Sequence, residues 1–179
     1  EALAAMPDES KDQAKDILNT FMEQARATQV FVGSPPAEAG TFGLSIVMQV
    51  KDASAIMDTM PQLAQVKQAA LRALLAEQPE AQADQLSIRW RPDAATVGDV
   101  TVGALIVEHP ELQDISAEER RQMTAVLGDE TVRFFVAPAS ENAVVMTFGG
   151  GETFLAQAIQ AASNGAQLTT LPDVAAVMS

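Results

Sequence analysis

The segment MTFGGGETFLAQAI, residues 146–159, has the pattern of a strand that enters a glycine turn and then a helix. Such a turn can bind phosphate, because the free amides at a helix start attract anions. Two observations favour a structural corner instead. Glu152 already places a carboxylate at the positive end of the expected helix, and the lysine of a nucleotide-binding loop is missing. We therefore interpret Gly149–Thr153 as a sharp turn that the glycines permit.

His109 is the single histidine, and the chain has no cysteine. A zinc site would need further ligands, and a Ser–His–Asp arrangement would need a serine on a sharp turn, but no G-x-S-x-G motif occurs. His109 stands at the end of an expected strand and is followed by Pro110 and Glu111. We expect a solvated loop histidine.

Arg89, Trp90 and Arg91 form the one cluster that is both basic and aromatic. Because side chains alternate along a strand, Trp90 should share a buried face with Leu86 and Ile88, and both arginines should point outward. The alternative is a carboxylate-binding patch, since guanidinium groups bind carboxylates well.

The acidic residues form small groups, namely Asp8 with Glu9, Asp114, and Glu118 with Glu119. No D-x-D-x-D-G calcium loop is present, and no pattern places two of these carboxyls across a cleft. They are typical of helix starts and solvated surfaces. We expect no catalytic residue, no cofactor site and no specific metal site.

Composition limits the partners. Of the 179 residues 47% are apolar, enough for a sizeable core, and 24 acidic against 11 basic residues give a net charge of −13. A field of this sign repels nucleic acid and anionic membranes. We expect no transmembrane segment, because no run approaches about 18 consecutive apolar residues. The start at Glu1 indicates a trimmed chain or a mature fragment.

The elements that must position these residues follow from the apolar spacing. Steps of three and four predict a helix over residues 10–27 with one apolar face: Ala14, Ile17, Leu18, Phe21, Met22 and Ala25. Period two predicts strands over 29–33 and 42–50, joined by a loop. A helix should begin at Ala53 with Asp52 as its cap, break at Pro61, and resume through Leu75 before Pro79.

The second half has the same alternation. It predicts strands 86–90 and 99–107 around a loop at 91–98, and a helix between Ser116, which has a capping-box Glu119, and Gly128. Two further strands should flank a loop at 137–142 and precede a helix over 152–162. Five methionines should fill gaps in the core: Met22, Met48, Met57, Met60 and Met123.

This order predicts the α+β class. We expect an antiparallel sheet built from three strand–strand–helix units, helices that cover one face, and an N-terminal helix. The units indicate a weak internal repeat of roughly 30 to 50 residues. The chain is either a single domain over 1–179 or two tightly packed halves, 1–80 and 81–165, with 166–179 as a linker to a further module.

The last stretch, AIQAASNGAQLTTLPDVAAVMS, resembles the segment that links repeated modules in certain uncharacterised exported bacterial proteins, and the first 18 residues are similar. The resemblance implies an exported or envelope-associated protein, in the periplasm or cell envelope, although a cytoplasmic location stays open. It also implies a non-catalytic module that binds a protein partner or sister modules. The alternative is a small-molecule-binding enzyme domain in which Gly149–Thr153 act with Arg89 or Arg91.

Overall fold

The computed structural model describes residues 6–33, 40–75, 85–109 and 114–163. Its elements follow in the order α2 (Asp8–Gln24), β1 (Ala25–Gly33), β2 (Gly43–Val50), α3 (Ala53–Leu75), β3 (Ser87–Val97), β4 (Val100–Glu108), α5 (Ala117–Leu127), β5 (Val132–Ser140), β6 (Ala143–Gly149) and α6 (Gly151–Ser163). The expected loop before β2, Pro79 and the segment 166–179 lie wholly or mostly outside the described residues.

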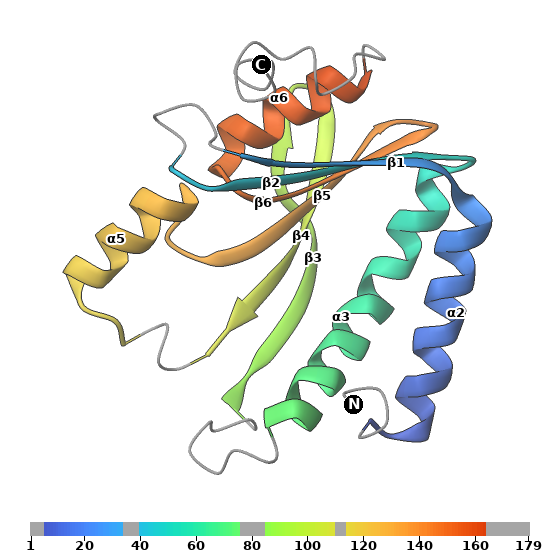
Figure 1. Cartoon of the computed structure of the whole chain (residues 1–179), viewed down its shortest axis with the longest axis horizontal. Coiled ribbons are helices and arrows are strands. Elements are labelled where there is room, and N and C mark those ends of the chain that lie inside the picture. Colours follow the sequence, from blue (N-terminus) through green and yellow to red (C-terminus); the bar gives the residue numbers. More distant parts are fainter. Residues whose placement is uncertain (1–5, 34–39, 76–84, 110–113, 164–179) are drawn as a thin grey trace.

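The strands form one six-stranded sheet in the order β1-β2-β6-β5-β4-β3 (Figure 1). Every neighbouring pair is antiparallel. Three hairpins, each followed by a helix, build this sheet after the N-terminal helix α2. The predicted α+β class and antiparallel sheet are therefore confirmed. Strands from both expected halves of the chain join through the pairing of β2 with β6.

The helices cover both faces of the sheet, so the expectation of one covered face is wrong. Val144 and Val145 are neighbours on β6 and point to opposite sides. Val144 packs in a cluster with Ile56 and Met60 of α3, whereas Val145 packs in a cluster with Leu155 of α6. The alternation of apolar residues along each strand predicted one apolar face per strand and therefore one covered face of the sheet. Here the central strands are apolar on both faces.

Helix α5 begins and ends as predicted, but it barely touches the sheet. Ser116 and Glu119 form the expected capping box, and Gly128 ends the helix with φ 69°. None of its residues is buried. Its C-terminal end is attached through the carbonyl of Val126, which accepts hydrogen bonds from the amides of Thr41 and Phe42 at 3.1 and 3.0 Å.

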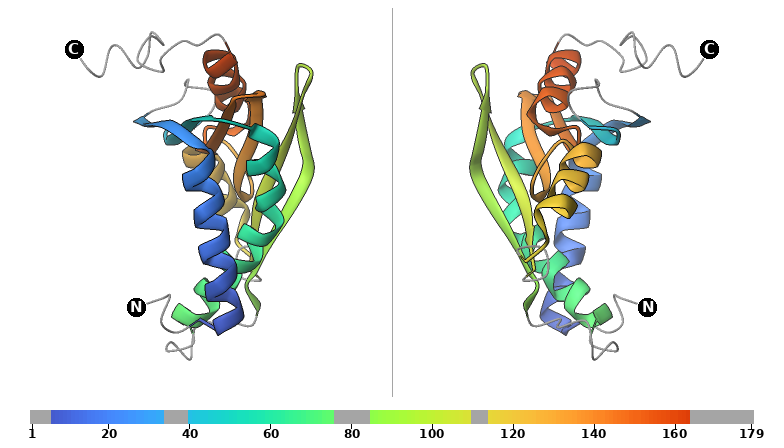
Figure 2. Two further views of the ribbon diagram at one scale, coloured as in Figure 1. Left: turned by 90° about the vertical axis from the view of Figure 1, so that its right-hand side faces the viewer. Right: turned by 90° about the vertical axis from the view of Figure 1, so that its left-hand side faces the viewer.

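Helix α2 packs along α3, which lies between α2 and the β3–β4 hairpin (Figure 2). Ile17 is buried against Val66 of α3, and Phe21 is half-buried beside it. Two residues expected on the buried face are exposed, Leu18 by 58% and Met22 by 71%. The error has a geometric cause, because one neighbouring helix covers a narrower stripe than a sheet would.

Four expected boundaries are wrong. The helix expected through residue 27 ends at Gln24, because Ala25 already pairs with Val50 as the start of β1. Helix α3 continues through Pro61, which lies on its exposed side, so packing on both sides of the proline outweighs one lost hydrogen bond. The expected loop 91–98 is mostly strand, with a register shift between Arg91 and Ala95 and a two-residue turn at Gly98 and Asp99. Residues 137–140 also belong to a strand, and only Glu141 and Asn142 form that turn.

Candidate functional site

The glycine turn is a packed corner. Gly149, Gly150 and Gly151 have φ values of 73°, 74° and 55°. A Cβ on Gly149 would lie 2.4 Å from the carbonyl oxygen of Phe42, and one on Gly150 would lie 2.4 Å from the Cβ of Phe154. Glycine is needed here both for the backbone conformation and for the close approach. Neighbouring groups therefore occupy the positions that side chains at Gly149 and Gly150 would take, as expected for a structural corner.

The cluster around Trp90 follows the predicted alternation. Leu86 and Ile88 are buried and Trp90 is half-buried, while Arg89 and Arg91 are exposed. Arg89 forms an ion pair with Glu108 on the neighbouring strand.

These arginines belong to β3 at one edge of the sheet, and β4 and β5 separate them from β6, which leads into the glycine turn. The structure therefore does not bring Gly149–Thr153 together with Arg89 or Arg91. His109 is half-buried just after β4, and the residues that follow it, Pro110 and Glu111, lie outside the described part of the chain.

The acidic residues lie where helix starts need them. Asp8 accepts a hydrogen bond from Lys11 at 3.0 Å, and this bond lowers the pKa of its carboxyl. The side-chain hydrogen bond with Ser116 is the main cause that lowers the pKa of Glu119. Asp114 is exposed. In the described ranges, no group of three or more His, Asp or Glu side chains is arranged to hold a metal ion.

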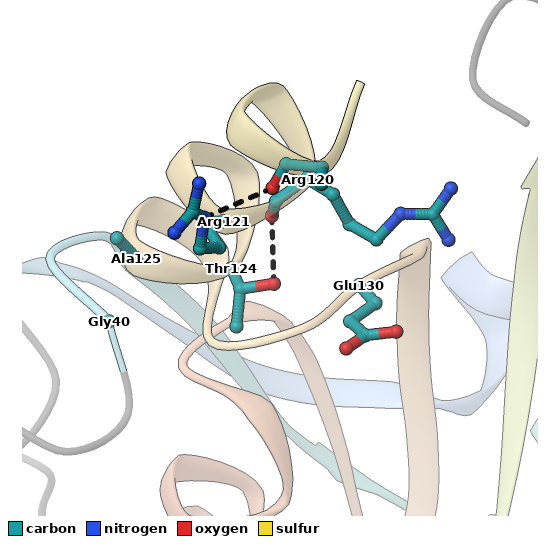
Figure 3. A pocket seen from close by; sticks show the side chains of 7 residues that line it. Gly40, Arg120, Arg121, Thr124, Ala125 and Glu130 are labelled. Carbon is teal, nitrogen blue, oxygen red and sulfur yellow. Dashed lines mark hydrogen bonds between the residues drawn. The ribbon is translucent and has the colours of Figure 1, made fainter. Parts of the chain in front are cut away.

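A shallow depression beside α5 is lined by Gly40, Ala117, Arg120, Arg121, Thr124, Ala125 and Glu130 (Figure 3). Two arginines could in principle bind an anion together. Figure 3 shows that their side chains point in opposite directions, and Arg121 donates from Nε to the carbonyl of Ala117 at 3.2 Å. The depression thus lacks a convergent pair of guanidinium groups.

A more enclosed cavity lies between α3 and the sheet, and we call it the α3 groove. Its volume is about 230 Å³. Helix α3 contributes Met60, Leu63 and Lys67. Strands β2 to β6 contribute Leu44, Ile46, Ile88, Leu105, Val107, Phe134, Val136, Met146, Thr147 and Phe148. The lining is almost entirely apolar, as is usual for sites that bind small molecules.

The path of α3 creates this groove. The helix begins beside the end of β2, where the amide of Ala53 donates to the carbonyl of Glu141 at 2.9 Å and Asp52 Oδ1 accepts from the amide of Ser54 at 2.9 Å. Its first turns pack on β2, β5 and β6, and Ala64 then packs on Ile88 and Leu105 of the far edge. Because α3 crosses the sheet obliquely, it leaves one corner of this face uncovered.

Aromatic rings line the uncovered corner. One row of cross-strand neighbours runs from Val32 through Leu44, Phe148, Phe134 and Leu105 to Trp90. Phe134 and Phe148 stack with their centroids 4.4 Å apart, and Phe134 remains 38% exposed. Burying such a ring against a ligand is favourable, since each 100 Å² of apolar surface removed from water contributes about 2.5 kcal/mol.

Sequence reasoning missed the α3 groove. The strand residues were interpreted only as core, and the expected break at Pro61 placed Leu63 and Lys67 on a separate helix. One signal was present in the sequence. Met60, Leu63 and Lys67 are spaced by three and four, so a lysine stands in the apolar stripe of a helix.

Comparison of the chain with family models, with curated proteins and with solved structures finds no match. The resemblance to modules of exported bacterial proteins is thus supported by the residues quoted for it alone. In the described segments, every helix is too short or too polar to cross a membrane.

Proposed function

We propose that this chain is a non-catalytic binding module and that the α3 groove is its ligand site. The observation that carries the proposal is an apolar cavity of about 230 Å³ whose wall includes the partly exposed ring of Phe134. In the described ranges, Lys67 and Thr147 are the only polar residues of its lining. Neither forms a nucleophile–base pair with another lining residue, so the groove is suited to holding an apolar group rather than to transforming it.

Binding of a neutral solvatochromic dye, followed by fluorescence, tests this function. We expect the wild-type chain to bind the dye, and we expect Phe134→Ser to weaken binding at least about fivefold, because the variant removes an aromatic wall. Leu74→Ser is the matched control, since Leu74 is exposed on the same helix and does not line the groove. Absence of dye binding, or equal weakening by both variants, contradicts the proposal.

As part of the same proposal, the module belongs to a larger exported or envelope-associated bacterial protein. The resemblance of residues 158–179 supports this context. Sequencing the complete gene tests it directly. We expect a signal sequence or a lipid-attachment cysteine upstream, together with further modules, and a complete reading frame without any of these contradicts the context.

A second candidate function, scaffolding by strand pairing, is favoured by β1. This edge strand exposes Val30 by 63% and Val32 by 59%, and it contains no proline. The opposite edge, β3, carries Pro92 and a register shift, which are devices that discourage pairing with other chains. The contrast supports association of β1 with an equivalent strand of another copy or a sister module.

Sedimentation at increasing concentration tests the second candidate. We expect reversible self-association that Val30→Lys abolishes, because a charge on an edge strand opposes pairing. Val126→Lys adds the same charge at an exposed site on α5 and should leave association unchanged. A chain that stays monomeric up to about millimolar concentration contradicts strand pairing between copies.

A further inference from the structure

Lys67 introduces one positive charge into a groove whose other described lining residues are uncharged. It follows Met60 and Leu63 along α3 at steps of three and four, so the three side chains share one face of the helix. The residue is exposed while also lining the cavity. A lysine in such a position lays its methylene stem along apolar surface and keeps its ammonium group at the water boundary. We therefore expect the ammonium group at the mouth of the groove.

Among the residues that the structure describes, no acidic side chain lines the groove. Lys67 is the only ionisable residue in the described part of the lining, and the positions three and four away on α3 are Leu63, Ala64, Ala70 and Leu71. Among the described residues, Lys67 forms no ion pair. In a chain with a net charge of −13, the mouth of the groove is thus a local exception of opposite sign.

We infer that the α3 groove binds amphipathic carboxylates, with the apolar chain in the cavity and the carboxylate paired with the Lys67 ammonium group. This inference rests on the proposed function and names its ligand class. The apolar wall favours ligands with a hydrocarbon chain, and the ammonium group of Lys67 favours a negatively charged head group. A cationic head group would be repelled by Lys67, and a neutral one would gain only the apolar contact.

The volume of the cavity limits the length of the hydrocarbon chain that a ligand can place in it. A volume of about 230 Å³ corresponds to about eight water molecules at about 30 Å³ each. We therefore expect affinity to rise by about fourfold per added methylene up to a chain of roughly eight to ten carbons, and then to level off.

Calorimetric titration with decanoate, decanol and decylamine, each below its aggregation limit, tests the inference. We expect decanoate to bind about threefold to fivefold more tightly than decanol, which is the upper part of the range for an exposed ion pair, and decylamine to bind most weakly. The preference should shrink at 0.5 M salt. Lys67→Gln should remove the preference for decanoate over decanol, and Lys67→Glu should favour decylamine.

Lys51→Gln is the control, because it removes a charge just before α3 at a residue outside the groove lining. Retention of the decanoate preference by this variant, with its loss in Lys67→Gln, supports the inference. Equal binding of all three ligands, weakened by Phe134→Ser, overturns the inference and leaves the proposed function standing. Failure of all three ligands to bind overturns both.

Discussion

Gly150 shows how one residue type can be required for two reasons. Its φ of 74° lies in the left-handed region, which costs a residue with a Cβ about 1–2 kcal/mol, and its missing side chain leaves room for Phe154. Gly98 has a similar φ of 58° in the turn between β3 and β4, but a Cβ there would meet no atom within 4 Å. Comparing Gly150 with Gly98 therefore separates the cost of the backbone conformation from the cost of a steric clash.

We predict that Gly150→Ala lowers the free energy of unfolding by about 2–4 kcal/mol, since it adds a steric clash to the backbone cost. Gly98→Ala should lower it by only about 1–2 kcal/mol. Urea denaturation of both variants measures the difference. An equal loss in the two variants means that Phe154 moves aside freely and that the corner is not tightly packed.

At the level of single residues, the sequence predicted an interaction correctly where it depends only on residues within one helical turn. Ser116 and Glu119 form their capping box, and Asp52 caps α3, because these bonds depend on spacing within one turn. Leu18 and Met22 were misplaced because their exposure depends on which helix lies nearby. Spacing along the chain carries no information about the width of the surface that covers a helix.

Helix α2 provides the sharpest prediction at the level of elements. Ile17 and Leu18 are adjacent, but Ile17 is 6% exposed against α3 and Leu18 is 58% exposed. We predict that Ile17→Ala lowers the free energy of unfolding by about 2–4 kcal/mol, because it leaves a cavity between the helices. Leu18→Ala should change it by less than about 0.5 kcal/mol.

Thermal or urea unfolding of these two variants checks the contact between α2 and α3. A small effect of both substitutions would mean that α2 is detached from α3 in solution. A large effect of Leu18→Ala would mean that a further surface covers the outer side of α2, such as a second copy of the chain.

The elements themselves were mostly predictable, but their ends were not. Pro61 was interpreted as a break and residues 91–98 as a loop, yet α3 continues through Pro61 and β3 continues through Pro92 to Val97, with only Gly98 of that loop in the turn. Local propensity lost to tertiary packing in both places. The buried residues Met60 and Ala64 flank Pro61, and the paired hairpin of β3 and β4 tolerates Pro92 because β3 is an edge strand.

For the whole molecule, the sequence predicted the class and the antiparallel hairpins but not the arrangement that creates the α3 groove. The groove depends on three facts that no local pattern contains: the placement of β5 and β6 in the middle of the sheet, the helices on opposite faces, and the oblique path of α3. Phe134 and Leu44 come from distant parts of the chain. Only the fold makes them walls of one cavity.

The sheet order also has a consequence for biosynthesis. The hairpin that occupies the centre of the sheet, β5 with β6, is the last of the three to leave the ribosome. Until Gly149 has been translated, β2 and β4 cannot find their inner neighbours, and the nascent chain carries two hairpins with open apolar edges. At about 5–20 residues per second, the chain between the end of β4 and the end of β6 takes about 2 to 8 seconds to appear. During those seconds the growing polypeptide is most exposed to aggregation, and this is the interval in which a chaperone would protect it.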